Sequence, residues 1–335
     1  MLLVREQESF EVRQQQARLP RRRLCRLEVG DFSLVGAGPG DPELLTVAAY
    51  RAICDPLALV IADRLVSPEV LDLVRGELRV AKKTPGCAEE AQREIYRWIT
   101  EGLRSDRKVI RLKIGDPFIF GRGGEEILYV REHLGVEATV VPSISAAIAA
   151  PSAAGVPLTH RGVADKVVLT TGFGRDGSEP DLPEFQEFQT VVMLMGVGRV
   201  RRVCDLFVSL KNFPKHCPAL VIEKATLKNH QRVIIGDLQD LADLVETHQI
   251  KAPATIVVGD AVRVLYPHHP HGLIQHKSQT TTDEEMAFPS LGGAIGDNDI
   301  ITQQIMTDLK VVHRNIQDTH RDKNHTTTTI LQRTF

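Results

Sequence analysis

The chain has 335 residues, of which 42% are hydrophobic, so it is long enough to bury the cores of two ordinary globular domains. Its 41 lysines and arginines nearly balance 43 aspartates and glutamates, and a net charge of −2 argues against bulk attraction to nucleic acid or to an anionic membrane surface. No run approaches the roughly 20 apolar residues that span a bilayer, and the five cysteines lack zinc-type spacing, so we expect no membrane segment, no metal site and a cytoplasmic location.

A polar and basic arm, residues 1–30, comes first and has no clear apolar face. From residue 31 to residue 157, short β-branched runs alternate with amphipathic segments. This alternation predicts an α/β domain built on a mostly parallel sheet. The predicted strands are Phe32–Val35, Leu57–Ile61, Val109–Leu112 and Ala138–Val141. The predicted helices are Pro42–Ile53, Ala88–Leu103 and Glu125–His133.

The alternation restarts and predicts a second α/β domain over residues 158–266. Its predicted strands are Lys166–Thr170, Thr190–Leu194, Ala219–Ile222, Arg232–Ile235 and Thr255–Val258. Its predicted helices are Val200–Leu210 and Leu238–His248. In residues 267–335, histidines, threonines and charges dominate, and this composition predicts a flexible tail with one short helix at Ile300–Val312. The histidines of His268–His271 are expected to belong to this tail rather than to a metal site.

The first predicted strand runs into the motif GAGPGDP, residues Gly36–Pro42. Glycines let the backbone turn sharply and let a ligand approach main-chain amides. A dinucleotide-binding loop requires GxGxxG, and here the third glycine comes one residue early. Taken alone, the motif therefore indicates either a ligand-binding loop or a tight strand-to-helix turn.

A second glycine-rich segment, KIGDPFIFGRGGEE, follows the strand Val109–Leu112 and covers Lys113–Glu126. Ligands of open α/β sheets bind beyond the carboxyl ends of the strands, and a loop this long and rich in glycine is more often functional than structural. Two Gly-Asp-Pro turns at two strand ends of one domain therefore predict a ligand site there.

These segments occur in a characteristic order: Val35–Thr46, Asp63–Ser67, Gly115–Glu126, Gly155–Arg161 and Gln231–Val233. Together they resemble the uroporphyrinogen-III C-methyltransferases of the tetrapyrrole methylase family, over residues 32 to 265, and Thr159–Asp165 is most similar to fungal members. The resemblance implies two α/β domains with a ligand cleft between them and a homodimer. It also implies methyl transfer from S-adenosyl-L-methionine to uroporphyrinogen III, which gives precorrin-2 for sirohaem synthesis and S-adenosyl-L-homocysteine.

Matched positions imply roles for individual residues. The cofactor is expected to contact Pro39, Ile114, Gly115, Asp116, Ile119, Ser145, Ala146, Met195 and Ala225. Asp63 matches the proton acceptor of the family and Lys82 the proton donor. The methylated macrocycle carries positive charge and must lose a proton, so a carboxylate at a strand end either accepts it or stabilises the cation. Because the substrate carries many carboxylates, we expect cationic anchors inside the matched motifs, namely Arg64, Arg122, His160 and Arg161.

Other interpretations of these residues stay open. Asp63 is also typical of a helix cap or turn, Lys82 beside Lys83 of a solvated pair, and Arg122 of a partner for Glu125 or Glu126 one helical turn on.

Departures from the family pattern leave the function open as well. Ile114, Ser143, Ala81 and Ala225 stand where most members carry glycine, and a β-branched residue such as Ile114 would strain the loop if its φ were positive. The alternative functions are a methyltransferase acting on another tetrapyrrole or corrin intermediate, and a non-catalytic tetrapyrrole-binding protein.

Overall fold

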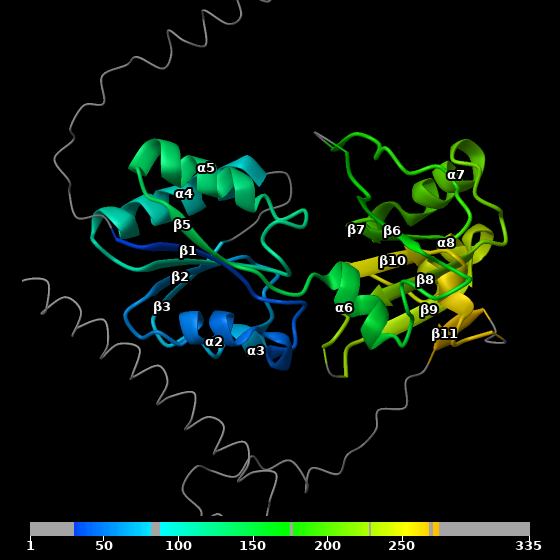
Figure 1. The fold of residues 1–335 in the computed structure, drawn as a ribbon, viewed down its shortest axis with the longest axis horizontal. Helices are drawn as coiled ribbons and strands as arrows, with labels where there is room; N and C mark the ends of the chain where they lie inside the picture. The colour runs from blue at the N-terminus through cyan, green and yellow to red at the C-terminus, as the bar shows by residue number, and fades with distance from the viewer. Residues whose placement is uncertain (1–29, 82–87, 175–176, 228, 268–270, 275–335) are drawn as a thin grey trace, which may run out of the picture. The chain divides into compact units, whose positions relative to one another are not determined.

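The computed structural model describes residues 30–81, 88–174, 177–227, 229–267 and 271–274, which all belong to one compact unit (Figure 1). They form two β-sheets, each with its own helices. The amino-terminal arm and the helix expected at Ile300–Val312 lie outside the described residues. Within the described residues, no helix combines the length and the apolar character that a membrane crossing requires.

The first sheet has five parallel strands in the order β3-β2-β4-β1-β5. They are β1 (Phe32–Gly36), β2 (Leu59–Ala62), β3 (Glu77–Val80), β4 (Val109–Lys113) and β5 (Ala138–Val141). The parallel sheet predicted from the alternation is confirmed, and β3 adds an edge strand that the sequence pattern did not indicate. Strands β1, β2 and β4 are almost wholly buried, as expected for a parallel sheet covered on both faces.

Figure 1 shows helices α4 and α5 on one face of this sheet and α2 and α3 on the other. Their bounds are α2 (Val47–Ile53), α3 (Pro68–Leu71), α4 (Ala88–Arg104) and α5 (Gly123–Leu134). Side chains of a strand alternate between the faces, so Val109 packs on the α4 and α5 side while Ile110 and Leu112 pack on the other. The prediction of one helix over Pro42–Ile53 is wrong. A short 3₁₀ helix, η1 (Pro42–Leu44), ends before Thr46, whose extended backbone and side-chain oxygen cap α2 instead.

The second sheet has six strands in the order β11-β9-β8-β10-β7-β6. They are β6 (Lys166–Thr171), β7 (Gln189–Leu194), β8 (Pro218–Glu223), β9 (Arg232–Asp237), β10 (Ala254–Val258) and β11 (Gly272–Ile274), with helices α7 (Val200–Leu210) and α8 (Leu238–Thr247). Only β6 and β7 pair in parallel, and the other pairs are antiparallel. Only eight residues of the sequence separate β8 from β9, and such a short connection makes neighbouring strands antiparallel.

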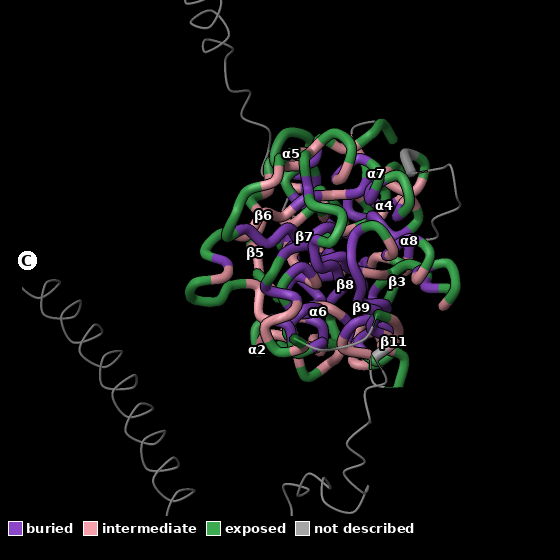
Figure 2. The backbone as a smooth tube through the Cα atoms, turned by 90° about the vertical axis from the view of Figure 1, so that its right-hand side faces the viewer, coloured by how far each residue is buried: buried purple, intermediate pink, exposed green. Residues whose placement is uncertain are grey.

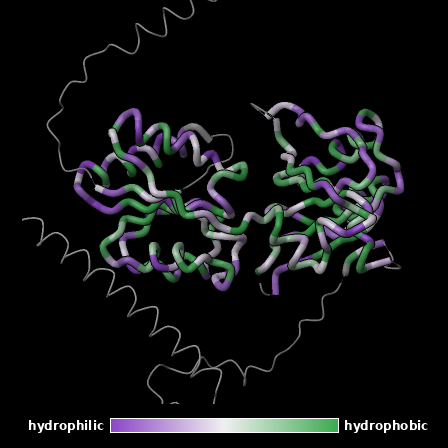
Figure 3. The backbone as a smooth tube through the Cα atoms, viewed as in Figure 1, coloured by the Kyte–Doolittle hydropathy of each residue, from purple (hydrophilic) through white to green (hydrophobic). Residues whose placement is uncertain are grey.

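Helix α6 (Ala146–Ala153) was not predicted, because its run of alanines has no polar face. Ser145 caps it by accepting a hydrogen bond from the Ala147 amide at 3.2 Å. Although α6 follows β5 of the first sheet, Ala147, Ala150 and Ala154 pack into the core of the second sheet. Figure 2 shows β7, β8 and β9 as buried, and Figure 3 shows hydrophobic residues concentrated in the strands of both sheets.

Candidate functional site

Two glycine loops meet at the carboxyl edge of the first sheet. Strand β1 pairs in parallel with β4 and β5, so the segments that follow these three strands lie side by side. Gly115 N donates a hydrogen bond of 2.8 Å to Gly38 O, and Gly38 N donates one of 3.3 Å to Gly115 O. Both glycines have left-handed backbones, with φ of +68° at Gly38 and +66° at Gly115. The two Gly-Asp-Pro motifs are therefore joined by a pair of backbone hydrogen bonds and lie next to each other.

The start of α6 completes this edge. An ideal Cβ built on Gly115 would lie 3.8 Å from Ser145 Cα and 4.0 Å from Ala146 N, which is ordinary contact distance. Asp116 Oδ2 accepts a hydrogen bond of 3.1 Å from Ser143 N, and Asp116 O accepts one of 3.3 Å from Ile119 N. The structure thus brings together Gly115, Asp116, Ile119, Ser145 and Ala146, and Pro39 sits half-buried in the facing loop.

The glycine replacements do not produce the strain that a positive φ would cause. Among the described residues, Ile114, Ser143, Ala81 and Ala225 all have negative φ values, and the left-handed position falls on Gly115 instead. The loop backbone therefore tolerates the β-branched side chain of Ile114.

Two predicted cofactor residues follow strands of the second sheet. Ala225 comes after β8 and packs in the same hydrophobic cluster as Ala147 and Ala150 of α6. Met195 comes after β7, adopts a left-handed φ of 60° and is 49% exposed, so it is not a core residue. Helix α6 thus connects Ala225 to the loops of the first sheet through its own packing.

Asp63 directly follows β2, and its carboxylate bonds to residues in and directly after β4 rather than to a helix end. Arg111 Nη2 donates to Asp63 Oδ1, Ile114 N donates to Oδ2 at 3.4 Å, and Lys113 Nζ lies 3.8 Å from Oδ2. Only 25% of the Asp63 side chain is exposed. The alternative interpretation of Asp63 as a helix cap therefore has no support in the geometry, whereas its interpretation as a turn residue is present, since Asp63 O accepts a hydrogen bond of 3.1 Å from Val66 N.

Glu126 holds the other side of the two cations. It is completely buried in the first turn of α5, where Lys113 Nζ donates to Oε1 at 2.9 Å and Arg111 Nε lies 3.1 Å from Oε2. Arg111 is 1% exposed and also donates to the backbone oxygens of Ile61 and Leu112, each at 3.1 Å. We call Asp63, Arg111, Lys113 and Glu126 the charge cluster; its two positive and two negative charges balance.

The charge cluster fixes the ionisation of Asp63. Burial by itself raises the pKa of this carboxyl, but the charges of Arg111 and Lys113 and the hydrogen bonds from Arg111 and Ile114 N outweigh burial and lower the pKa below its ordinary value. For Arg111, burial lowers the pKa, and the charges of Asp63 and Glu126 more than restore it. The Asp63 carboxylate is therefore negatively charged at neutral pH.

The predicted anchors for the substrate are exposed. Arg64 follows Asp63, and His160 and Arg161 lie in a turn where His160 N donates to Ala164 O at 2.9 Å. Arg122 Nη2 lies 2.6 Å from Glu125 Oε2, so its alternative role as a partner of Glu125 is present in the structure. Lys82 lies outside the described residues. The contacts of these residues with the substrate stay predictions.

Sequence reasoning missed Arg111, Lys113 and Glu126. One signal was available: Arg111 and Lys113 are charged residues at alternate positions in β4, whose other residues are apolar. Charged side chains in a buried strand need partners of opposite charge. The identity of that partner was not readable, because Glu126 reaches β4 only through the packing of α5 on the sheet.

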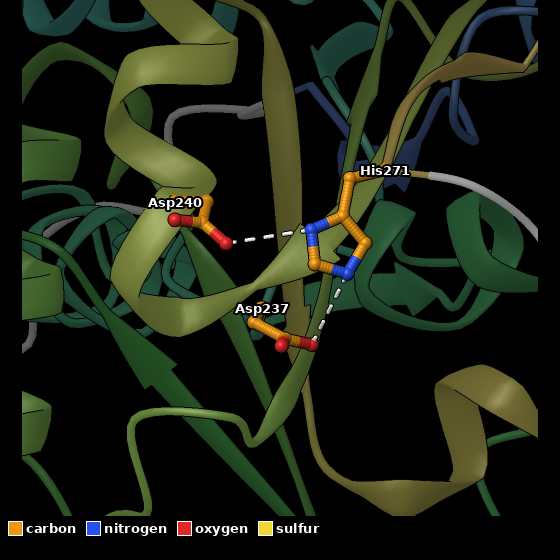
Figure 4. Close-up of side chains that lie close together, drawn as sticks. All are labelled: Asp237, Asp240 and His271. Carbon is orange, nitrogen blue, oxygen red and sulfur yellow. Dashed lines mark ion pairs between the residues drawn. The ribbon is translucent and has the colours of Figure 1, made fainter.

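A group of potential metal ligands lies where β9 ends, α8 begins and the chain enters β11 (Figure 4). His271 Nδ1 lies 3.4 Å from Asp240 Oδ2, and His271 Nε2 lies 3.7 Å from Asp237 Oδ1. Arg263 Nη2 donates to Asp237 Oδ1 at 2.8 Å and lies 3.1 Å from His271 Nε2. Arg263 Nη2 therefore lies against two atoms of this group, Asp237 Oδ1 and His271 Nε2, and we describe the group as an ion-pair cluster. The expectation that His271 belongs to a flexible tail is wrong, because the chain directly after it forms β11, which pairs with β9, whereas His268 and His269 lie outside the described residues.

Known proteins with similar sequences act on tetrapyrroles. Residues 31–242 match the family of Tetrapyrrole (Corrin/Porphyrin) Methylases. The chain is 39% identical over 245 residues to the uroporphyrinogen-III C-methyltransferase of Saccharomyces cerevisiae, covering 71% of this chain and 40% of that protein. It is 38% identical over 240 residues to the uroporphyrinogen-III C-methyltransferase of Methanocaldococcus jannaschii, covering 70% of this chain and 98% of that protein. The resemblance inferred from the motifs is confirmed.

A solved structure shows the same fold. The uroporphyrin-III C-methyl transferase of Thermus thermophilus complexed with S-adenyl homocysteine is 38% identical, with a TM-score of 0.61, covering 70% of this chain and all of that one. The predicted fold class, two successive α/β domains, is thereby confirmed. The chain spans about half the length, or less, of several relatives, including 47% of the Schizosaccharomyces pombe protein and 50% of the Aeromonas hydrophila protein.

Proposed function

Because the chain belongs to the tetrapyrrole methylase family, we propose that it transfers methyl groups from S-adenosyl-L-methionine to uroporphyrinogen III, giving precorrin-2 for sirohaem synthesis. The observation that carries this proposal is the convergence of the two glycine loops, the start of α6 and the ionised Asp63 at one edge of the first sheet. Methyl transfer to carbon mainly requires that donor and acceptor be aligned and that water be excluded. Such a site needs a backbone that fits the cofactor and a charge next to the reacting atoms. The glycine loops and Asp63 are suited to these two needs.

The residues present suit S-adenosyl-L-methionine. Gly38 and Gly115 are buried and bond to each other through their backbones, and this pairing places the half-buried Pro39 and Ile114 beside them at the sheet edge. The amino end of α6 carries a partial positive charge that favours a carboxylate such as that of the cofactor's methionine part. Met195 and Ala225, which follow β7 and β8, are the proposed contacts on the second sheet. When bound, the cofactor supplies the electrophilic methyl group.

Asp63 is suited to stabilising positive charge on the methylated macrocycle. A general base works best when its pKa lies near the operating pH, and the pKa of Asp63 is lowered instead. An oriented, ionised carboxylate in a water-poor site stabilises a developing cation at no cost in reorganisation. Between the two roles open to Asp63, its environment therefore favours cation stabilisation over proton acceptance. For Lys82, the role of proton donor stays the proposal.

Arg122 is the anchor whose contribution is easiest to isolate. Replacing Arg122 by Gln is expected to raise KM for uroporphyrinogen III about tenfold, because one charge-assisted pair with a substrate carboxylate is lost. The free energy of unfolding should change by less than about 0.5 kcal/mol, since the partner of Arg122 is the exposed Glu125. Arg131→Gln is the matched control, because Arg131 forms a similar exposed pair with Glu137 near the other end of α5. Steady-state kinetics with an equal KM for both variants would remove Arg122 from the substrate site.

The proposed reaction is tested by incubating the purified chain with S-adenosyl-L-methionine and uroporphyrinogen III without oxygen. Mass spectrometry should detect a methylated tetrapyrrole and S-adenosyl-L-homocysteine. Turnover of a later corrin intermediate, with none of uroporphyrinogen III, would support the alternative substrate. Tetrapyrrole binding without any calorimetric signal for S-adenosyl-L-homocysteine would support the non-catalytic alternative. Absence of both binding and turnover would reject the proposal.

We also propose that the protein acts as a homodimer in the cytoplasm, as the resemblance to the family implies. Light scattering on the purified chain should give twice the monomer mass of 37.1 kDa. A monomer mass at the protein concentration of the activity assay would exclude the dimer.

A further inference from the structure

Thr226, in the turn between β8 and β9, has an unusual backbone conformation. Its φ is 67°, in the left-handed region that glycine adopts readily and that branched side chains rarely adopt. Such a conformation persists only where the surroundings hold it, and it is often found at functional sites. Contacts of the Thr226 side chain and backbone must therefore stabilise a conformation that glycine would adopt without strain.

Hydrogen bonds tie Thr226 to distant parts of the chain. Thr226 N donates to Gln231 Oε1 at 2.9 Å, and Gln231 Nε2 donates to Ala153 O, in the last turn of α6, at 3.2 Å. Thr226 Oγ1 accepts a hydrogen bond of 3.3 Å from Asp41 N in the first glycine loop, 185 residues away in sequence. The turn is thereby connected both to α6 and to the first glycine loop.

The first glycine loop is fitted closely against this turn. A Cβ on Gly40 would lie 2.8 Å from Leu227 Cδ2 and 3.7 Å from Thr226 Oγ1. The Gly40 carbonyl is held from behind by Ser67 Oγ at 2.6 Å. The residue before Asp41 is therefore in contact with Ser67 on one side and with the β8–β9 turn on the other, and these contacts hold the Asp41 amide next to Thr226.

The hydrogen bond between Thr226 and Asp41 N joins two segments that carry proposed cofactor-binding residues. Ala225 immediately precedes Thr226, while Pro39 belongs to the loop that Thr226 holds through Asp41. We propose that Thr226 is a positioning residue, whose hydroxyl holds the first glycine loop and the β8–β9 turn in the arrangement that binds S-adenosyl-L-methionine. Threonine stands at a position that backbone stability alone would give to glycine, because glycine has no hydroxyl to accept from Asp41 N. The inference rests on the proposed function, since it assigns Thr226 to the same cofactor site.

Different effects on stability and binding test this role. In Thr226→Gly the relaxed left-handed backbone offsets the stability lost with the hydrogen bond to Asp41 N, so Tm should change by no more than a few degrees. The same variant loses the hydroxyl, so calorimetric titration should show S-adenosyl-L-homocysteine binding about tenfold more weakly, in keeping with the loss of one positioning hydrogen bond. Thr226→Ser keeps the hydroxyl and should bind within twofold of the unaltered chain.

Asn229 provides a matched control. It lies in the same turn, is exposed and has a left-handed φ of 65°. Asn229→Gly also relaxes a left-handed backbone in this turn, although by less because asparagine adopts that region more readily than threonine, and it keeps the bond to Asp41 N, so it should leave the affinity unchanged.

The outcomes separate the inference from the proposed function. If the unaltered chain does not bind S-adenosyl-L-homocysteine, the proposed function fails. If it binds and Thr226→Gly binds equally well, the positioning role of Thr226 is overturned while the function stands. Equal weakening in Thr226→Ser, or a large fall of Tm in Thr226→Gly, would also overturn it, because the hydroxyl would then not be the cause or the role would be structural.

Discussion

Glu126→Gln is expected to lower the free energy of unfolding by about 3–5 kcal/mol, because it removes one partner of a buried ion group. Glu126 is fully buried, and its carboxylate faces both Arg111 and Lys113. Glutamine keeps the size of the side chain, removes its charge and replaces one acceptor oxygen by an NH2 group that cannot accept from Arg111 or Lys113. Two buried cations then remain with Asp63 as the single compensating carboxylate in the charge cluster. Urea unfolding followed by circular dichroism measures the difference.

Glu125→Gln is the matched control for this prediction. Glu125 is the preceding residue in the same helix, and its carboxylate pairs with Arg122 on the surface. An exposed pair contributes less than about 0.5 kcal/mol, so this variant should unfold almost like the unaltered chain. If both variants lost the same stability, the buried charge of Glu126 would not be the cause.

A double replacement keeps the prediction testable if Glu126→Gln folds too poorly to be measured. Lys113→Met removes one of the cations that Glu126 compensates, and Lys113 Nζ is bonded to Glu126 at 2.9 Å. The double variant Glu126→Gln/Lys113→Met should therefore be more stable than Glu126→Gln alone. A double variant that is less stable than the single one would contradict the charge argument.

Much of the fold was predictable from the sequence because its signals are local. The helix expected at Val200–Leu210 is α7 with the same bounds, since its apolar residues recur at helical spacing and face the core. The β-branched runs predicted the buried strands for the same reason. The pairing direction in the second sheet was not predictable in this way. The gap between the predicted strands Ala219–Ile222 and Arg232–Ile235 is too short for a parallel crossover, but no local signal shows that β10 enters the sheet antiparallel between β7 and β8.

The candidate site was predictable only where a residue stands out in its local sequence. Gly38 and Gly115 stand out as glycines after strands, and parallel strands bring such ends to one edge of the sheet. The charge cluster is recognisable only in part, because Arg111 and Lys113 stand out as charges in an apolar strand but their partners do not. Asp63 and Arg111 meet because β2 and β4 are neighbours, a pairing that the order of strands along the chain does not reveal. Thr226 likewise looks like an ordinary turn residue until its φ is known.

Asp63→Asn is expected to lower kcat for methylation of uroporphyrinogen III on the order of 10²–10³-fold, the range found when one aligned electrostatic group is removed from a reaction centre. Asparagine still accepts a hydrogen bond from Ile114 N but carries no charge. The affinity for S-adenosyl-L-homocysteine should change little, because the bond from Ile114 N still ties the second glycine loop to residue 63. Steady-state kinetics and calorimetry together separate the two effects.

Asp55→Asn is the control for this loss of activity. Asp55 also pairs with a cation, Lys108 at 2.8 Å, and that pair also lowers the pKa of the Asp55 carboxyl. It precedes β2, whereas Asp63 follows it, so the two aspartates lie at opposite edges of the sheet. Asp55→Asn should keep kcat within twofold. An equal loss in both variants would show that any ion pair of this sheet affects turnover, and the role of Asp63 would fail.

The pH dependence of stability gives a second reading of the same residue. Because the pKa of Asp63 is lowered in the folded chain, its ionised carboxylate contributes stability that is fully present above the unfolded pKa of about 3.9. That contribution is lost as the pH falls through the lower folded pKa. The stability difference between the unaltered chain and Asp63→Asn should therefore stay constant from neutral pH to about pH 5 and shrink below about pH 4. A difference that already shrinks between pH 7 and pH 5 would mean that the carboxyl takes up its proton there. Asp63 would then be suited to proton acceptance rather than to stabilising the cation.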